Sequence, residues 1–228
     1  GEHFLSASPS LEEIRMWRID TGRCTRVISC QENVRSMLVS QSLVLASTQS
    51  RAIEIYGLTS DEGGSTRFED SHSRHIQSLA MHPSQILFAT GGLDKTIKLW
   101  GYGERSKNLR LQKSLCGHKS VVLNLVFLLN LPLLVSADAT GAIHKWDFRT
   151  GHCLYVVKTR LGSIRSLISL DTNPKIDNFI ALGSREDLSF IEVRKIVPAI
   201  LFLYHQRSVR SLIHKLGLQT LQVILQYQ

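Results

Sequence analysis

The chain has 228 residues, 43% of them hydrophobic, and a formal net charge of +8 at neutral pH. This composition can bury a core and excludes a chain that is disordered for want of apolar residues. The charge favours anionic partners, but there is no long Lys/Arg run to indicate nucleic-acid binding, and no stretch reads as a membrane span or secretory signal.

The predicted elements are strands that recur along the chain in two alternating series. The chain opens on a segment typical of a second strand, residues 4–8. One series then begins at Val34, Ile76, Val122, Ile164 and Val209, and the other at Ile14, Ile53, Ile97, Ile143 and Leu188. Successive members lie between 39 and 46 residues apart. A repeat of about 40–45 residues with four strands per unit is typical of a β-propeller.

The clearest unit runs from Gly117 to Val157. Its innermost strand begins at Val122, a second strand follows the turn at Pro132, and the third strand ends at Trp146. The residues 147–151 form the turn into the outermost strand. Alternating apolar positions bounded by Gly, Pro, Asp and Thr favour this strand–turn–strand order.

These patterns predict an all-β propeller with about five recognisable four-stranded units and a truncated sixth. The units span approximately residues 1–29, 30–70, 71–115, 116–158 and 159–203, with a partial unit at 204–228. A seven-unit ring needs roughly 280–315 residues at this repeat length. The alternatives are therefore a fragment, a shortened isoform or an incomplete ring.

The sequence resembles the WD-repeat family, whose units run from a Gly-His pair to a Trp-Asp pair. Gly117-His118 and Trp146-Asp147 match these pairs literally, and the preceding unit matches through His72 and the segment from Thr90 to Trp100. The resemblance covers nearly the whole chain and implies a scaffold that binds other proteins.

The resemblance also implies a buried polar relay of His, Ser/Thr, Asp and Trp within each unit. The residues that match it are His72, Thr90, Asp94, Trp100, His118, Ser136 and Trp146. By register, only the unit of His72 supplies all four types, because Thr140 occupies the Asp position of the next unit. Cys30 and Arg160 replace the His elsewhere, and Leu11, Ser50 and Arg185 replace the Asp.

No catalytic, metal or cofactor site is expected. The relay residues include His, Ser and Asp, but the chain has no Gly-x-Ser-x-Gly segment, and the repeat already assigns each of them. His72, His75 and His82 lack the spacing of a zinc finger, and His82, before Pro83, is expected to be solvated. The glycine-containing loops match no nucleotide-binding pattern. We therefore expect a non-enzyme without cofactor, metal or small-molecule substrate.

The four cysteines form no CxxC pair, and Cys24 and Cys153 occupy the same position in different units. Equivalent residues of different units lie far apart, so we expect four free thiols and a reducing compartment. This favours an intracellular protein, in the nucleus, the nucleolus or the cytoplasm.

Basic residues at one end of the predicted propeller suggest a partner-binding rim. The resemblance places Arg51, Arg74, Lys119, Arg160, Arg185 and Arg207 there. Arg pairs well with carboxylate and phosphate, so this rim suits an acidic protein surface or peptide, or the phosphates of an RNA. The alternative is that these are ordinary solvated charges.

The expected function is a scaffold for protein–protein interaction in a multisubunit assembly. The order of segments 46–52, 72–92 and 138–154 is similar to transducin-β-like WD-repeat subunits of the nucleolar small-subunit processome, and this resemblance implies ribosome biogenesis (pre-rRNA processing). The alternatives are a substrate receptor of a ubiquitin ligase or a coat-assembly subunit. The fold alone does not decide among them.

Overall fold

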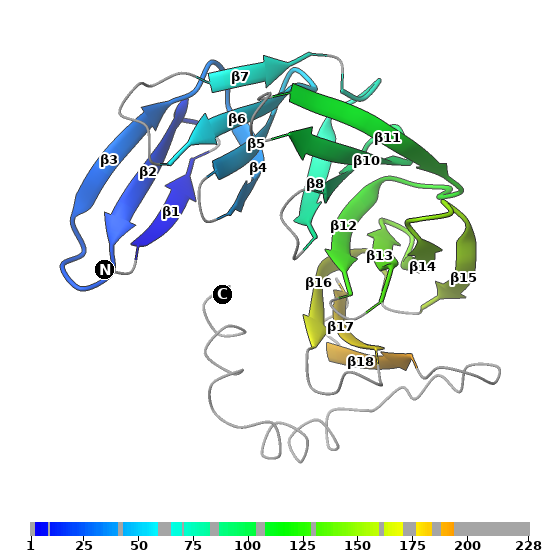
Figure 1. Ribbon diagram of the computed structural model, residues 1–228. Helices are drawn as coiled ribbons and strands as arrows, with labels where there is room; N and C mark the ends of the chain where they lie inside the picture. Colours follow the sequence, from blue (N-terminus) through cyan, green and yellow to red (C-terminus); the bar gives the residue numbers. More distant parts are fainter. Residues whose placement is uncertain are drawn as a thin grey trace.

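Five antiparallel sheets follow one another around an arc in the computed structural model (Figure 1). The structure describes residues 3–8, 10–40, 43–58, 65–69, 71–82, 87–103, 108–128, 131–159, 162–170, 177–183 and 188–193. Their order around the arc is their order in the chain, and neighbouring sheets touch through their innermost strands.

Each sheet is a meander in which sequence neighbours pair. Sheet 1 contains β1 (His3–Ala7), β2 (Glu13–Arg18) and β3 (Cys24–Ser29). Sheet 2 contains β4 (Val34–Val39), β5 (Leu43–Thr48), β6 (Ile53–Gly57) and β7 (Ser65–Phe68). Sheet 3 contains β8 (Ile76–Met81), β9 (Leu87–Gly92), β10 (Thr96–Gly103) and β11 (Asn108–Cys116). Sheet 4 contains β12 (Val122–Phe127), β13 (Leu133–Asp138), β14 (Ala142–Asp147) and β15 (Cys153–Lys158), and sheet 5 contains β16 (Ile164–Leu170), β17 (Asp177–Gly183) and β18 (Leu188–Val193).

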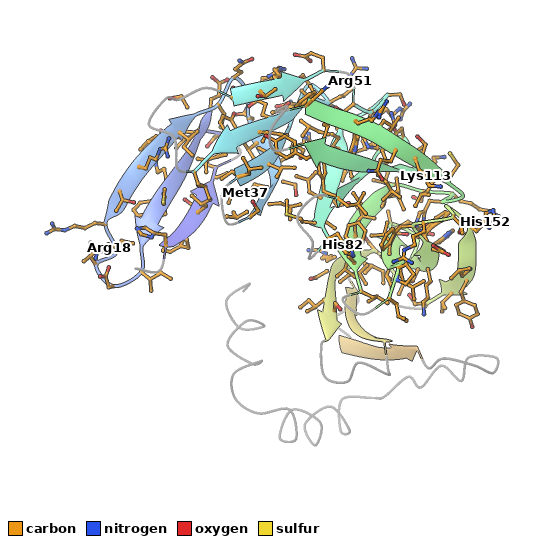
Figure 2. All side chains as sticks on the ribbon, viewed as in Figure 1. Arg18, Met37, Arg51, His82, Lys113 and His152 are labelled. Atoms are coloured by element: carbon orange, nitrogen blue, oxygen red, sulfur yellow. The ribbon has the colours of Figure 1, made fainter. Side chains whose placement is uncertain are left out.

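Burial follows the position of a strand within its sheet. Every residue of β13, an inner strand, is buried, whereas β15 at the outer edge is exposed except at Val157. In Figure 2, the half-buried Met37 of β4 lies on the inner side of the arc, and the exposed His152 lies on the outer side. An inner strand is covered on both faces, which is why β13 reads as a nearly continuous apolar run.

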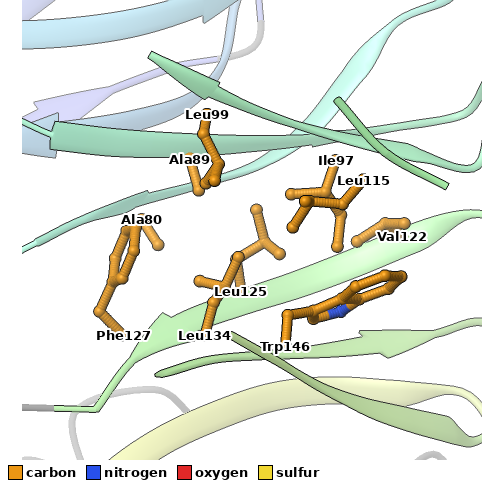
Figure 3. Close-up of a cluster of buried hydrophobic side chains, with 10 residues drawn as sticks. All are labelled: Ala80, Ala89, Ile97, Leu99, Leu115, Val122, Leu125, Phe127, Leu134 and Trp146. Carbon is orange, nitrogen blue, oxygen red and sulfur yellow. The ribbon is translucent and has the colours of Figure 1, made fainter. Parts of the chain in front are cut away.

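A separate hydrophobic cluster fills each junction between consecutive sheets. Figure 3 shows the one between sheets 3 and 4, where Leu99 and Leu115 face Leu125, Leu134 and Trp146. Three similar clusters join sheets 1 and 2, sheets 2 and 3, and sheets 4 and 5. Burial of these apolar side chains supplies the main driving force for the arrangement.

The hairpin between the second and third strands has the same geometry in sheets 2, 3 and 4. Its last residue has a positive φ in each case: 77° at Arg51, 67° at Lys95 and 84° at Gly141. The amide of that residue donates to the carbonyl three positions earlier, on Thr48, Gly92 or Asp138. Arg51 and Lys95 thus occupy a conformation that favours glycine.

The innermost strands share a second irregularity. The pairing of β4, β8, β12 and β16 with the next strand shifts after the first residue, leaving one residue of each strand without a register partner. These bulged residues are Arg35, Gln77, Leu123 and Arg165. A β-bulge turns the side chain of the extra residue out of the regular alternation.

The prediction of an all-β propeller built from repeating meanders is confirmed, with the arc open over the described residues. The truncated sixth unit at 204–228 lies outside the described residues. Within the part of the chain that the structure describes, no helix is long and apolar enough to cross a bilayer.

The expectation for His82 was wrong. Its ring makes edge contacts with Phe127 and Phe148, each at a centroid distance of 5.3 Å, and is only partly exposed. Burial lowers the pKa of His82, and the charge of Arg149 lowers it further. The side chain packs across the junction of sheets 3 and 4 because two aromatic rings of sheet 4 offer it an apolar surface.

Candidate functional site

The polar relay of sheet 3 joins a loop, two strands and the hairpin between them. Trp100 Nε1–H donates to Thr90 Oγ1 at 2.9 Å, and Thr90 Oγ1 lies 2.6 Å from His72 Nε2. His72 Nδ1 lies 2.9 Å from Asp94 Oδ2. The indole N–H only donates, so the Thr90 hydroxyl gives its own hydrogen to Nε2, and His72 carries its proton on Nδ1, facing Asp94. Each group is satisfied with a neutral imidazole.

Sheet 4 repeats the relay with a serine. Trp146 Nε1–H donates to Ser136 Oγ at 2.8 Å, and Ser136 Oγ lies 2.6 Å from His118 Nε2. His118 Nδ1 lies 3.0 Å from Asp138 Oδ2. The order of donors and acceptors is the same, so His118 is also the neutral tautomer with its proton on Nδ1.

Asp138 corrects the expectation that this unit lacks a carboxylate. Asp94 is the third residue of its hairpin turn, and Thr140 does occupy that place in sheet 4. Asp138 is the first residue of the same turn and still reaches the histidine, while its other oxygen accepts hydrogen bonds from the amides of Thr140 and Ala142 at 2.9 and 3.0 Å. Register alone missed it because the carboxylate moved two residues along the hairpin.

Sheet 2 has a charged network in place of the relay. Ala46 stands where sheet 3 has Thr90, so the hydroxyl at the centre of the relay is missing. Glu54, fully buried on β6, accepts hydrogen bonds from Tyr56 and Arg67. The Arg67 guanidinium also donates to Glu32 at 2.7 Å.

Glu32 anchors this network to the hairpin turn of sheet 2. Its second oxygen accepts the amide hydrogen of Ser50 at 2.8 Å, and Ser50 is the residue at the Asp position. Burial opposes ionisation of Glu32, but hydrogen bonds from Ser50 and Arg67 outweigh it and lower the pKa to about 2. Burial, then hydrogen bonds to Cys30 and Glu54, raise the pKa of Tyr56. One residue in the sequence could have indicated this charged network: Glu54 is an acid at the position where the other third strands carry Arg, Lys, His or Ser.

Sheet 1 keeps half of the relay. Trp17 Nε1–H donates to Ser6 Oγ at 2.8 Å, as the tryptophans of sheets 3 and 4 do. Leu11, exposed in the hairpin between β1 and β2, supplies no carboxylate. Among the described side chains, the tryptophan–hydroxyl bond therefore recurs in three sheets, and the histidine–carboxylate pair in two.

Burial sets the protonation of the relay histidines. It lowers the pKa of His72 and of His118, and the neighbouring carboxylates only partly oppose the shift. The ring of His144 lies against that of His118, with centroids 3.8 Å apart and planes tilted by 33°. Burial, followed by repulsion from His118, lowers the pKa of His144 to about 4. Burial raises the pKa of Asp94 and Asp138, but hydrogen bonds, first those from Thr96 and Thr140, make the net shift downward. Near neutral pH the histidines are neutral and the carboxylates charged.

The structure describes three of the six residues proposed for the basic rim. Arg74 and Lys119 are exposed in the loops that precede sheets 3 and 4. Arg51 is more buried, and its guanidinium Nη1 donates to the carbonyl of Ser73 at 3.3 Å, which ties sheet 2 to sheet 3 (Figure 2). Three further members lie outside the described residues: Arg160, Arg185 and Arg207.

Comparison with known proteins identifies the repeat. Residues 64–101 match the WD domain, G-beta repeat. The chain is 30% identical over 167 residues to "Target of rapamycin complex subunit LST8" of Mus musculus, covering 67% of this chain and 47% of LST8. Over 96 residues it is 29% identical to "WD repeat-containing protein 3" of Homo sapiens and 30% identical to "Probable coatomer subunit beta'" of Schizosaccharomyces pombe. Those matches cover 42% of this chain, and 10% and 12% of the relatives.

The chain belongs to the WD-repeat family. It spans about half the length of LST8. The segment that matches the family profile contains all four residues of the sheet 3 relay, from His72 to Trp100.

The relays of this WD-repeat chain have the connectivity of a catalytic triad but not its accessibility. Asp138, His118 and Ser136 are linked in the order acid, base, hydroxyl. The side chain of Ser136 is fully buried, and its oxygen already accepts the Trp146 hydrogen. A nucleophile must reach its substrate beside an oxyanion hole. The geometry therefore fits a structural role, and the same holds for Thr90.

One group of possible metal ligands lies in sheet 4. His118, Asp138 and His144 each offer a ligand atom, and these atoms lie within 4.8 Å of one another. Both ring nitrogens of His118 already have hydrogen-bond partners, Asp138 on one side and Ser136 on the other. The spacing of these residues matches no metal motif, and the arrangement suits the WD-repeat relay better than a metal ion.

Proposed function

We propose that the chain is a non-enzymatic scaffold that binds other proteins in a multisubunit assembly. The similarity to LST8 carries the proposal, because it extends over 67% of this chain and LST8 is named as a subunit of a complex. A second relative is named as a coatomer subunit. The buried relays support this role, because they stiffen the sheets without offering an accessible nucleophile.

The finer proposal places that assembly in ribosome biogenesis, with the protein in the nucleus or nucleolus. It rests on the segments 46–52, 72–92 and 138–154 and on the net charge of +8. Exposed Arg74 and Lys119 are the described residues that would contact acidic protein surfaces or RNA phosphates.

The alternative is a coat-assembly subunit, which the match to the coatomer subunit favours, or a substrate receptor of a ubiquitin ligase. Either would give the protein partners whose binding does not depend on RNA.

Affinity purification of the tagged protein from its own cells, with and without ribonuclease, tests these proposals by mass spectrometry. Pre-ribosomal proteins released by ribonuclease are the result expected for ribosome biogenesis. Coat or ligase subunits that resist ribonuclease would replace that assignment and keep the scaffold. A protein recovered alone at native expression would contradict the scaffold itself.

A further inference from the structure

A cavity of about 590 Å³ opens where sheets 1, 2 and 3 meet. Ala7 of β1 lies on one side and Gln77 of β8 on the other. The first residues of β4 form most of the wall, together with Asn33, which precedes them, and Gln49, in the hairpin turn after β5. Figure 2 labels Met37, another lining residue, on the inner side of the arc.

The polar side chains of this cavity lack partners within the described part of the chain. The side-chain oxygen of Asn33 is buried and accepts no hydrogen bond. Arg35 is exposed, and no ion pair or hydrogen bond occupies its guanidinium among the described residues. A buried amide oxygen without a donor costs free energy, which would be recovered if the Asn33 side chain turned its oxygen towards a ligand N–H.

The bulges place two of these side chains. Arg35 and Gln77 are the extra residues of β4 and β8, without register partners on β5 and β9. The same irregularity thus presents a guanidinium and an amide to one cavity from two neighbouring sheets. Bulges often redirect side chains in this way beside binding sites.

The nearest acid in the sequence does not neutralise Arg35. Glu32, three residues earlier, is held by Arg67 and by the amide of Ser50. Among the described residues no carboxylate forms an ion pair with Arg35, so its positive charge is available to a ligand.

We propose that this cavity binds an extended peptide segment of a partner protein through an anionic side chain, which pairs with Arg35. The peptide backbone supplies an N–H to Asn33, and the amides of Gln49 and Gln77 complete the polar contacts. Apolar contact comes from Val34 and Met37. This inference rests on the proposed scaffold function and specifies the chemistry of one partner segment.

Fluorescence anisotropy with labelled peptide mixtures tests the site. The peptides have about nine residues, a length of about 30 Å when extended, with randomised flanks and a central Glu, phosphoserine or Lys. The full chain is expected to bind the Glu or the phosphoserine mixture at least about tenfold more tightly than the Lys mixture, since opposite charges attract in the cavity. The two anionic mixtures distinguish a carboxylate ligand from a phosphorylated one.

Variants locate the binding. Arg35→Glu should remove the preference for anionic peptides, and Gln77→Ala should weaken binding of the preferred mixture severalfold. Arg110→Glu is the matched control, because Arg110 is exposed on β11, far from the cavity lining. Equal binding of all three mixtures, binding of none, or an unchanged preference in Arg35→Glu would overturn the proposal.

Two experimental outcomes distinguish failure of the cavity proposal from failure of the scaffold proposal. If Arg35→Glu still co-purifies every partner that the unaltered protein recovers, and the peptides show no preference, the cavity proposal fails and the scaffold stands. If the unaltered protein recovers no partner, the scaffold fails first.

Discussion

Sheets 2 and 3 have the same backbone but different polar interiors. Both fold as four-stranded meanders whose hairpin ends in a left-handed residue, Arg51 or Lys95. Sheet 3 secures its hairpin with the neutral His72 and the carboxylate of Asp94. Sheet 2 uses Glu32, which reaches its hairpin from the preceding loop and is held by Arg67.

The difference shows that the fold requires hydrogen-bond acceptors for the hairpin amides rather than one particular set of residues. In sheets 2, 3 and 4 a carboxylate accepts hydrogen bonds from hairpin amides, although it comes from a loop, from the third turn position or from the first. Buried polar groups must be paired, and several residue combinations meet that demand. The two solutions should nevertheless fail in different ways.

The largest effect is expected from Arg67→Met in sheet 2. The change leaves Glu54 buried as a charge without its cationic partner, so the free energy of unfolding should fall by about 3–5 kcal/mol, measured by urea denaturation. Adding Glu54→Leu should recover much of the loss. Glu69→Ala, which removes only the exposed partner of Arg67, is the control and should cost less than about 1 kcal/mol. An Arg67→Met variant as stable as this control would refute the network.

Removal of the relay carboxylate should cost about 2–3 kcal/mol in sheet 3 or sheet 4, because a buried imidazole N–H and hairpin amides lose their acceptor. Asp94→Thr and Asp138→Ala test this by thermal denaturation. If the two turn positions are interchangeable, Gly92→Asp added to Asp94→Thr should restore part of the stability. The restoration is partial because a Cβ at Gly92 lies 3.0 Å from His72 Nδ1. No restoration would show that the position of the acid matters as much as its presence.

Acidification should weaken sheets 3 and 4. The relay histidines have lower pKa values in the folded chain than in the unfolded chain. As the pH falls from about 6.5, the unfolded chain therefore binds protons more readily than the folded chain, and the free energy of unfolding decreases. For His144, with a pKa of about 4, the loss at pH 5 should reach about 2 kcal/mol. His144→Gln should reduce the pH dependence of the melting temperature, and His152→Gln, at an exposed position, should leave it unchanged. A profile that His144→Gln does not alter would contradict this assignment.

The smallest effect concerns the left-handed residue itself. Lys95→Gly gives sheet 3 the residue that sheet 4 has at Gly141, and should change stability by less than about 1 kcal/mol, in the stabilising direction, because it relieves the positive φ. Lys95→Val is the contrast and should destabilise. Denaturant midpoints measure both, and a destabilising glycine would show that the lysine side chain contributes to the hairpin.

The repeat period was enough to predict the fold, because apolar alternation and turn residues recur in every unit and bury the same faces. Alignment of the repeats also predicted that one polar relay contains His72, Thr90, Asp94 and Trp100. It failed at Asp138, since a side chain can reach the same point from another turn position, and at Arg67, which lies on an outer strand and acts on a residue 13 positions away. Position in a repeat predicts backbone geometry, whereas polar contacts depend on where the side chains end.

The hydrophobic clusters have a consequence for how the molecule comes apart. Each cluster belongs to a single pair of consecutive sheets, so the described part of the chain has a series of separate hydrophobic contacts between sheets rather than one shared core. In such a series the stability is a sum over neighbours, and opening can stop at the weakest contact. A destabilising substitution of Trp146 would weaken the contact between sheets 3 and 4. Hydrogen exchange would then show sheets 4 and 5 unfolding separately from sheets 1 to 3.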